Sequence, residues 1–397
     1  MSSEAPVPPI RVVVVGGGVA ALEAVLALRA FAADAVDLTL VAPEPVFELR
    51  ALQTAAPFGR GSADGIALRE LLAELDGTFV RAAVVAVDAD RRRVRCADGL
   101  EIPYDTLVLA LGATAVPAFC AATTLGAGRR PLGELVADLH SGRARSAAFV
   151  VPRGATWPLP LYELALMTAE ALTVRRPGTQ LHLVTPELQP LSVFGPQGSV
   201  VVAELLRDAG ITVHRGVAAE VRAGGIVDTG FDPVLRVDRV LALPALEGPR
   251  LDGVPATAQG FVPVSDHGVV DGLDGVYAVG DMTDRPVKQG GLACQQAEAA
   301  AAHIAWELGR LDVLPPLRQV LRGRLLTGRR DRFLERQGPR DVGSVGAEPL
   351  WWPPSKVAGR HLAPYLEGRG LVRLPLQAGP GAPGLDLEIP VLAPAPT

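Results

Sequence analysis

The sequence predicts an α/β fold with two similar strand–helix units and a separate C-terminal segment. The first unit is RVVVVGGGVAALEA at residues 11–24, in which a β-branched run, a glycine turn and a helical pattern follow one another. A second unit begins near residue 147, where SAAFVVP precedes LPLYELALMTAEAL. A further short strand, GVYAVGD at 275–281, comes after both. Strands that alternate with helices favour parallel sheets, so we expect two Rossmann-like dinucleotide-binding domains.

The first unit continues with segments that alternate in the same way. RVVVV is typical of a buried parallel strand, and DLTLVAPEP is the strand that follows the helix. GTFVRAAVVAVDADRRRVRCADG predicts a pair of strands with a turn near residues 88–91. IPYDTLVLALGA predicts another buried strand that ends in glycine.

The second unit and the chain after it show comparable patterns. TQLHLVTPE, ITVHRGVAAEV and RVDRVLALPAL predict strands, and SVVVAELLRDAGI predicts a helix between the first two. GGLACQQAEAAAAHIAWELG at 290–309 predicts an alanine-rich helix. Residues 374–397 are rich in proline, glycine and alanine, and we expect an extended tail there.

Length and composition exclude several classes of protein. A chain of 397 residues is too long for one ordinary core, and 49% hydrophobic with 20% charged residues is typical of a globular protein. The net charge of −5 argues against a nucleic-acid partner, because phosphate neutralisation needs a basic face. No uninterrupted apolar run is long enough for a membrane span, and the N-terminus lacks the pattern of a signal peptide. We therefore expect a cytoplasmic protein.

The three cysteines, Cys96, Cys120 and Cys294, lie far apart in the sequence. This spacing gives neither a disulfide framework nor a CxxC redox motif. With only six scattered histidines, no metal site is expected.

The glycine turn at 16–18 points to a nucleotide. Gly16, Gly18 and Ala21 fit the pattern GxGxx[GA] between a strand and a helix, where glycines admit a pyrophosphate to the helix N-terminus. The alternative is a glycine-rich turn that binds nothing. Glu44 follows the second strand and is a candidate for the ribose hydroxyls, although a solvated loop glutamate fits the same pattern.

The segment GVYAVGD closes a buried strand with Gly280 and Asp281. A carboxylate at such a strand end can accept a hydrogen bond from a ribityl hydroxyl. PVKQGG then opens the alanine-rich helix and carries Lys288, one of only two lysines in the chain. Lys288 and the helix N-terminus would form an electropositive spot suited to a reduced flavin, unless Lys288 is a plain surface charge.

GGGVAA, YDTLVLALGA, part of RVDRVLALPAL and GVYAVGD together resemble the flavin-dependent pyridine nucleotide–disulfide oxidoreductase superfamily, over residues 11 to about 310. The resemblance implies an FAD domain with an inserted domain that usually binds NAD(P)H. It implies that FAD is held by two groups of residues. The first group comprises Gly16, Gly17, Gly18, Val19, Ala20, Glu44, Arg50 and Val84. The second comprises Ala110, Gly112, Gly280, Asp281, Lys288, Gln289 and Gly290.

The second glycine turn of that superfamily is replaced here by VVPRGATWPLPLYE at 150–163. Only Gly154 remains, Pro152 removes a backbone donor, and Trp157 with Pro158 adds bulk where a diphosphate would lie. Pro158 and Pro160 still suit the first turn of a helix. We expect an inserted domain that keeps its architecture without a standard NAD(P)H cradle; the alternative is an atypical loop that still binds NAD(P)H.

This loss is similar to the sulfide:quinone oxidoreductase and flavocytochrome c sulfide dehydrogenase branch, as are PVKQGG and YELA at 162–165. The resemblance implies a redox-active cysteine pair near the flavin, with Cys120 and Cys294 as candidates. Cys294 in the first turn of a helix would have a lowered pKa. Packing is the alternative role for both cysteines.

The C-terminal part concentrates unusual residues. PLWWPPSKVAGRHLAPYLEGRG at 349–370 carries paired tryptophans that suit either a flat quinone pocket or a domain or dimer contact. The arginine-rich stretch at 314–338 suits contact with an anionic membrane surface or, as the alternative, a solvated helix face.

We therefore expect an FAD-binding domain at 1–115 and 245–313, an inserted domain at 116–244 and a C-terminal interface segment at 314–397. The function predicted is an FAD-dependent oxidoreductase that passes electrons from a small donor, such as a sulfur compound, to a quinone or another acceptor. One alternative is an NAD(P)H dehydrogenase of the type II or ferredoxin reductase kind, with an atypical cofactor loop. The other is a flavin-binding module without turnover.

Overall fold

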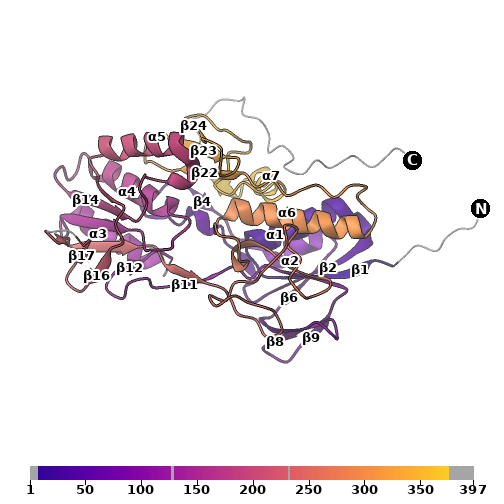
Figure 1. Ribbon diagram of the computed structural model, residues 1–397. Helices are drawn as coiled ribbons and strands as arrows, with labels where there is room; N and C mark the ends of the chain where they lie inside the picture. Colours follow the sequence, from indigo (N-terminus) through magenta and orange to yellow (C-terminus); the bar gives the residue numbers. More distant parts are fainter. Residues whose placement is uncertain (1–7, 127–128, 231–232, 375–397) are drawn as a thin grey trace, which may run out of the picture.

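The computed structural model describes residues 8–126, 129–230 and 233–374, and its elements gather around two parallel sheets (Figure 1). The tail expected at 374–397 lies outside the described residues except for its first position. The α/β fold class with two Rossmann-like domains is confirmed.

The first sheet has the strand order β21-β10-β1-β2-β6, with all neighbours parallel. Its strands are β21 (Val276–Ala278), β10 (Thr106–Leu109), β1 (Ile10–Val15), β2 (Val36–Ala42) and β6 (Thr78–Arg81). Residues 12–15 of the central strand β1 are buried on both faces, which explains their unbroken run of valines. The strand from residue 276 thus returns to the sheet begun at residue 10.

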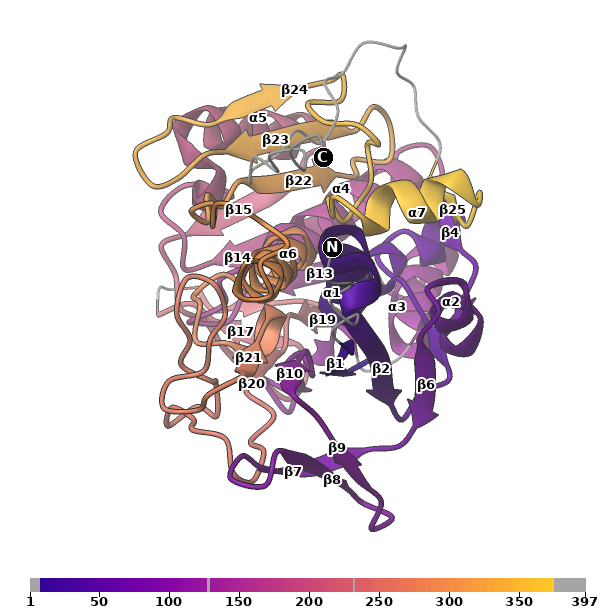
Figure 2. The same ribbon diagram turned by 90° about the vertical axis from the view of Figure 1, so that its right-hand side faces the viewer.

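Helices α1 (Val19–Ala32) and α6 (Gly290–Glu307) pack against each other on this sheet (Figure 2). Ala21, Ala24 and Ala27 of α1 share one core with Ala297, Ala300 and Ala301 of α6. Small side chains let the two helix backbones approach closely, so the alanine-rich sequence at 290–309 follows from this contact. The short helix α2 (Leu68–Glu74) packs beside β6.

The second sheet has the order β12-β19-β13-β14-β15 and is also parallel. Its strands are β12 (Thr123–Thr124), β19 (Arg239–Ala242), β13 (Ser146–Val150), β14 (Gln180–Thr185) and β15 (Thr212–Arg215). The helices of this unit are α3 (Arg129–Ser141), α4 (Leu159–Leu172) and α5 (Gly195–Asp208).

Smaller strands complete the two units. An antiparallel pair, β11 (Thr114–Val116) with β20 (Ala245–Glu247), lies where the chain passes between them (Figure 1). The pair of strands expected within residues 77–99 is β7 (Val84–Asp88) and β8 (Arg93–Cys96), which follow β6 and are joined by β9 (Glu101–Pro103) in a three-stranded sheet. The other short strands are β3 (Val46–Phe47), β4 (Ser62–Ala63), β5 (Ile66–Ala67), β16 (Glu220–Arg222), β17 (Ile226–Asp228) and β18 (Leu235–Arg236).

The arginine-rich stretch at 314–338 is not a helix, so the helical interpretation is wrong. It forms β22 (Leu321–Leu325) and β23 (Arg332–Arg336), which pair antiparallel and are joined by β24 (Ser344–Gly346). Leu321, Leu325 and Leu334 enter the core of the second domain. The arginines in between meet carboxylates, as in Arg322–Glu335 at 2.9 Å and Arg324–Asp331 at 2.8 Å. A strand period of two therefore separates the buried leucines from the paired arginines.

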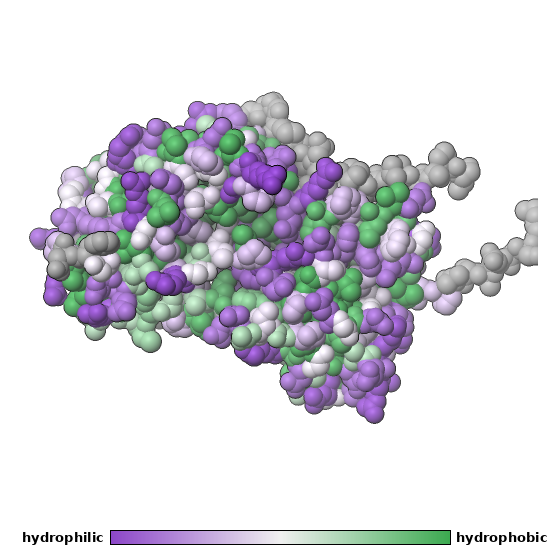
Figure 3. Space-filling view, viewed as in Figure 1, coloured by the Kyte–Doolittle hydropathy of each residue, from purple (hydrophilic) through white to green (hydrophobic). Residues whose placement is uncertain are grey.

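The chain then crosses back to the first domain. Helix α7 (Leu362–Gly368) packs on α1, and β25 (Val372–Arg373) pairs with β4. Among the described residues, no helix combines the length and apolar character needed to cross a bilayer. Figure 3 shows hydrophobic and hydrophilic residues interspersed over one face of the molecule.

Candidate functional site

The turn between β1 and α1 has room only for glycine at its first position. Gly16 has φ of +128°, and its N–H donates to the carbonyl of Val41 at 2.8 Å. A Cβ at this position would lie 2.2 Å from the carbonyl oxygen of Ala110. The contact of Gly16 with Ala110 fixes the end of β10 beside the start of α1, and any side chain would separate them.

Gly18, by contrast, faces open space. It is the N-cap residue of α1, no side chain caps the helix, and a Cβ here would meet nothing within 4 Å. The first backbone N–H groups of α1, from Val19 and Ala20 onward, thus point toward an open region with the positive end of the helix dipole behind them. This is the arrangement that binds a pyrophosphate, so the residues fit a dinucleotide cofactor.

The other residues predicted for this nucleotide lie around the same sheet edge. Gly112 has φ of +71°, and a Cβ there would also meet open space. Gly17 is in close contact with Ala42 and Leu68. Glu44 is exposed in the loop after β2, and Val84 begins β7. Glu44 is thus exposed, two residues beyond the end of β2. Its proposed hydrogen bond to the ribose hydroxyls stays a prediction.

The turn after β21 brings Gly280 and Asp281 to α1. Gly280 has φ of +77°, and a Cβ there would lie 3.0 Å from the Cβ of Ala20. Its N–H donates to Oε1 of the buried Gln296 at 2.9 Å, and the hydroxyl of Thr283 reaches the same oxygen at 3.2 Å. Gln296 was not predicted as a site residue. Its position on α6 brings it beside the turn at Gly280, and only the fold reveals this contact.

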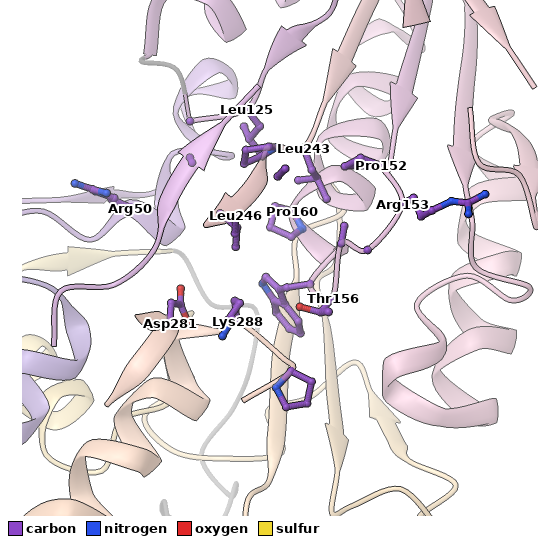
Figure 4. Close-up of a pocket in the computed structure, with 18 of the residues that line it drawn as sticks. Arg50, Leu125, Pro152, Arg153, Thr156, Pro160, Leu243, Leu246, Asp281 and Lys288 are labelled. Carbon is purple, nitrogen blue, oxygen red and sulfur yellow. The ribbon is translucent and has the colours of Figure 1, made fainter. Parts of the chain in front are cut away.

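Lys288 and Asp281 lie at one end of a cavity between the two domains (Figure 4). The ammonium of Lys288 sits 3.9 Å from the ring centre of Phe261 and donates to the carbonyl of Thr283. Burial lowers the pKa of Lys288 to about 8, although the nearby carboxylates oppose this shift. Burial likewise raises the pKa of Asp281 to about 6, against the attraction of Lys288. Both groups therefore titrate close to neutral pH.

The residues that follow Lys288 form the start of α6. Gln289 is the N-cap, and its side-chain oxygen accepts from the N–H of Leu292 at 2.7 Å. Its amide nitrogen donates to the carbonyl of Arg322 at 3.2 Å, which ties the helix to β22. A Cβ on Gly290 would lie 3.1 Å from a methyl group of Val357, so a side chain here would require Val357 to shift. Gln289 therefore occupies part of the helix N-terminus that was predicted to face a flavin.

The interdomain cavity has a volume of about 780 Å³. The first domain contributes Glu48, Arg50 and Gln53, and Arg50 lies exposed at its margin (Figure 4). The segment 152–157 and Pro160 line the opposite side, together with residues 243–246. The atypical loop between β13 and α4 is thus part of the cavity wall.

The N-terminus of α4 differs from that of α1 in its backbone donors. Pro158 is the N-cap residue and Pro160 the second helical residue, so neither carries an N–H. The N–H of Leu161 donates to the carbonyl of Pro158 at 3.0 Å. Trp157 stands before the helix and packs on Phe194, with ring centres 5.6 Å apart. A diphosphate would therefore meet proline rings and an indole where α1 offers backbone donors.

The carboxylate that follows β14 is already engaged in hydrogen bonds. In a dinucleotide-binding unit, an acid near the end of the second strand bonds the ribose hydroxyls. Glu187 lies there, but its Oε2 accepts from the hydroxyls of Tyr162 at 2.6 Å and Thr185 at 3.1 Å. Its Oε1 accepts from the N–H of Ser192 at 3.1 Å. Glu187 thus fixes its own loop.

The two candidate cysteines lie apart from each other. Cys120 is exposed between β11 and β12, and Cys294 is buried in α6, with its sulfur 4.0 Å from the carbonyl oxygen of Val19. A Cβ on Gly359 would lie 2.8 Å from that sulfur. Neither cysteine is among the residues that line the interdomain cavity. Their catalytic role stays a prediction, and the surroundings of Cys294 are those of a packed side chain.

A buried ion pair that the sequence did not reveal joins three parts of the chain. Glu163 of α4 is fully buried and contacts Lys356 of the C-terminal segment. Its carboxylate also accepts from the hydroxyl of Thr54 at 3.2 Å and the N–H of Leu326 at 3.0 Å. Burial raises the pKa of Glu163 and lowers that of Lys356. Two features of the sequence could have pointed to this ion pair. Lys356 is one of only two lysines in the chain, and Glu163 belongs to the YELA segment.

Lys356 also lines a second, smaller cavity of about 80 Å³. Its other polar members are Arg324, Ser355 and Glu367, and Leu49, Leu366 and Leu374 are among its apolar members. Trp351 lines neither cavity: it is buried against Phe333, with ring centres 5.3 Å apart. The buried tryptophan is therefore part of the packing of the C-terminal sheet.

Comparison with known proteins agrees with this geometry. Residues 10–142 match the family described as pyridine nucleotide-disulphide oxidoreductase. An NADH dehydrogenase-like protein of Mycobacterium tuberculosis is 30% identical over 293 residues, which span 68% of this chain and 72% of the relative. The chain belongs to the pyridine nucleotide-disulphide oxidoreductase superfamily and is a flavin-dependent oxidoreductase.

Solved structures show the same fold at low sequence identity. The sulfide:quinone oxidoreductase of Aquifex aeolicus superposes with a TM-score of 0.76 and 20% identity, over 85% of this chain and 87% of that chain. A ferredoxin reductase of Rhodopseudomonas palustris has a TM-score of 0.61 and 19% identity, over 82% and 81%. These likenesses establish the architecture, and the substrate must be argued from the site.

Proposed function

We propose that the flavin is FAD and that it lies along the first sheet. Its pyrophosphate would meet the N-terminus of α1 at Gly18, and its ribityl chain would run past Gly280 and Asp281. The open space at Gly18 and the close contact between Gly280 and Ala20 support this placement, because they make one continuous path. Bound FAD would supply the capacity to take up and release electrons.

We further propose that the enzyme takes electrons from a small donor and not through a standard NAD(P)H site. The observation that carries this proposal is the N-terminus of α4. Pro158 and Pro160 have no backbone N–H, and the N–H of Leu161 is already bonded to the carbonyl of Pro158. Hydrogen bonds to charged groups are worth about 1.5–3 kcal/mol each, so losing three would weaken diphosphate binding by several kcal/mol. The loss of these hydrogen bonds does not weaken the binding of an electron donor that has no diphosphate.

The chain's own residues would shape the electrostatics of the reaction. Lys288 places a positive charge on the cavity wall beside Asp281, where it would offset negative charge that develops there. The acceptor we propose for the electrons is a quinone or another small molecule.

A second candidate is an NAD(P)H dehydrogenase with an unusual cofactor loop. The observation that favours it is the similarity to the NADH dehydrogenase-like proteins of Mycobacterium tuberculosis. In that case the diphosphate would have to be held by side chains, and the cations that line the cavity are Arg50, Lys288 and the exposed Arg153 of the loop.

The test is an anaerobic visible spectrum of the purified holoprotein before and after one donor is added. NADH and sulfide are added to parallel samples. A flavin spectrum that persists with NADH and bleaches with sulfide agrees with the proposal. Rapid bleaching by NADH alone contradicts it and selects the second candidate. A spectrum that persists with both donors excludes sulfide and leaves another small donor to be sought.

A further inference from the structure

We propose that the second-domain half of the interdomain cavity binds a planar, uncharged organic molecule. This half is defined by Leu125, Pro152, Thr156, Trp157, Pro160, Leu243 and Leu246. The inference rests on the proposed function, because it assumes that the flavin takes the other half, beside Asp281 and Lys288. It goes further by naming the class of molecule that meets the flavin there.

The lining of this half is almost entirely apolar. Leu125, Leu243 and Leu246 come from the two chain crossings, and Pro152 and Pro160 come from the ends of the atypical loop (Figure 4). Apolar walls favour a ligand that leaves water without giving up a hydration shell around a charge. A ligand with a phosphate or carboxylate would lose that shell here without compensation.

The charged residues of the cavity lie elsewhere. Lys288 and Asp281 lie together at one end, and Arg50 is at the margin of the first domain (Figure 4). Arg153 belongs to the loop, but it is exposed and its side chain extends away from the cavity (Figure 4). Glu48, the remaining charged residue of the lining, also belongs to the first domain, so Arg153 is the one charged lining residue that the described part of the second domain contributes.

Trp157 supplies a flat wall for a ring. Its indole is half-buried and packs on Phe194, which is fully buried. Phe194 is itself fixed, since a Cβ on Gly323 of β22 would lie only 2.4 Å from its ring. An indole packed against a fixed ring is itself restrained, and aromatic rings pack favourably on one another either offset face to face or edge to face. A ligand that carries an aromatic ring therefore suits the contact with Trp157.

Two polar groups remain to orient the ligand. The exposed hydroxyl of Thr156 and the amide of Gln53 stand on opposite sides of the cavity, one on each domain. Both are neutral and can donate to, or accept from, an oxygen substituent on a ring. A ring carrying a hydroxyl or carbonyl therefore suits the site better than a bare hydrocarbon.

The experiment measures binding to the oxidised holoenzyme by calorimetry, with no turnover. The probes are naphthol, which is planar and neutral, and naphthalene sulfonate, its anionic counterpart of similar size. We expect one naphthol site at least about tenfold tighter than that for the sulfonate. Trp157→Gly should weaken naphthol binding about tenfold, while Trp157→Phe, which keeps a ring, should stay within about threefold. Trp352→Gly, at an exposed tryptophan outside both cavities, is the matched control and should change nothing.

Several results would overturn the inference. Tighter binding of the sulfonate, lost in Arg153→Gln, would show an anion site. Loss of naphthol binding in Leu374→Arg with Trp157→Gly unaffected would place the probe in the second cavity. Displacement of naphthol by NADH at lower concentration would show a dinucleotide site. Because no donor reacts in this assay, its outcome is separate from the bleaching test of the proposed function.

Discussion

Glu23 makes stability pH-dependent in a direction opposite to that of most carboxylates. It lies on α1, five residues beyond the cradle at Gly18, and is fully buried. Its two oxygens accept from the N–H groups of His361 at 2.8 Å and Leu362 at 2.7 Å, so it caps α7. Burial is the largest influence and raises the pKa of Glu23 to about 8, although these hydrogen bonds oppose it. The ionised form is therefore disfavoured in the folded protein.

The size of the effect follows from linkage. The folded protein holds this proton up to about pH 8, whereas the unfolded chain releases it near the ordinary pKa of 4.5. Stability therefore falls as the pH rises between these two values. From about pH 5.5 to about pH 8.5, Glu23 alone should remove roughly 3 kcal/mol from the free energy of unfolding. Glu23→Gln removes the titration but leaves one N–H without an acceptor, at a cost of about 1 kcal/mol.

Urea unfolding followed by circular dichroism tests this at both pH values. The wild-type protein should lose more stability than Glu23→Gln on going from acid to alkaline pH, so that the variant, about 1 kcal/mol less stable at pH 5.5, becomes about 2 kcal/mol more stable at pH 8.5. Glu101→Gln, at an exposed carboxylate on β9, is the control and should follow the wild type. Equal losses in the wild type and Glu23→Gln would refute the reasoning, because they would show that Glu23 folds in the same ionisation state as it has when unfolded.

Three further predictions concern the site. Gly18→Val should fold, since its side chain enters open space, yet release the flavin during gel filtration; retention of a normal visible spectrum would contradict the placement of the pyrophosphate. A Cys120→Ser and Cys294→Ala double variant should keep the anaerobic rate of flavin reduction within about twofold of the wild type, because neither residue lines the cavity; a rate lost a hundredfold would establish cysteine chemistry. Lys356→Met should cost about 3–5 kcal/mol in urea unfolding, and Glu163→Gln added to it should recover most of that loss; additive losses would mean that the two charges are not coupled.

The sequence was a reliable guide where the pattern is local. The β-branched run before Gly16 and the glycine before Asp281 predicted strands β1 and β21, and the fold pairs both with β10. The prolines at 158 and 160 predicted a helix without a phosphate loop, and α4 begins at residue 159. Each of these signals depends on backbone chemistry within a few residues, which a single sequence displays directly.

Contacts between distant segments could not be predicted. Glu163 and Lys356 are 193 residues apart, and neither is surrounded by a pattern that names its partner. Arg322 and Arg324 suggested a charged helix face because a run of arginines shows its sign and not its partners. Only the fold places Glu335 opposite Arg322 in the antiparallel register of β22 and β23, and brings Asp331, just before β23, to Arg324. The alternation of leucine with arginine was the available sign of a strand.

The N-termini of α1 and α4 differ in the backbone donors that they offer, and this difference bears on the chemistry of the protein. Both follow a parallel strand, so the topology alone would allow a nucleotide at each. At α1 the glycines leave backbone donors exposed to open space. At α4 the prolines remove donors, Glu187 is held by its own loop, and Trp157 covers the approach. We propose that a fold built for two dinucleotides has kept one such site and given the other an apolar wall. On this proposal the wall selects against donors that carry a diphosphate, because it presents proline rings and an indole where α1 presents backbone donors.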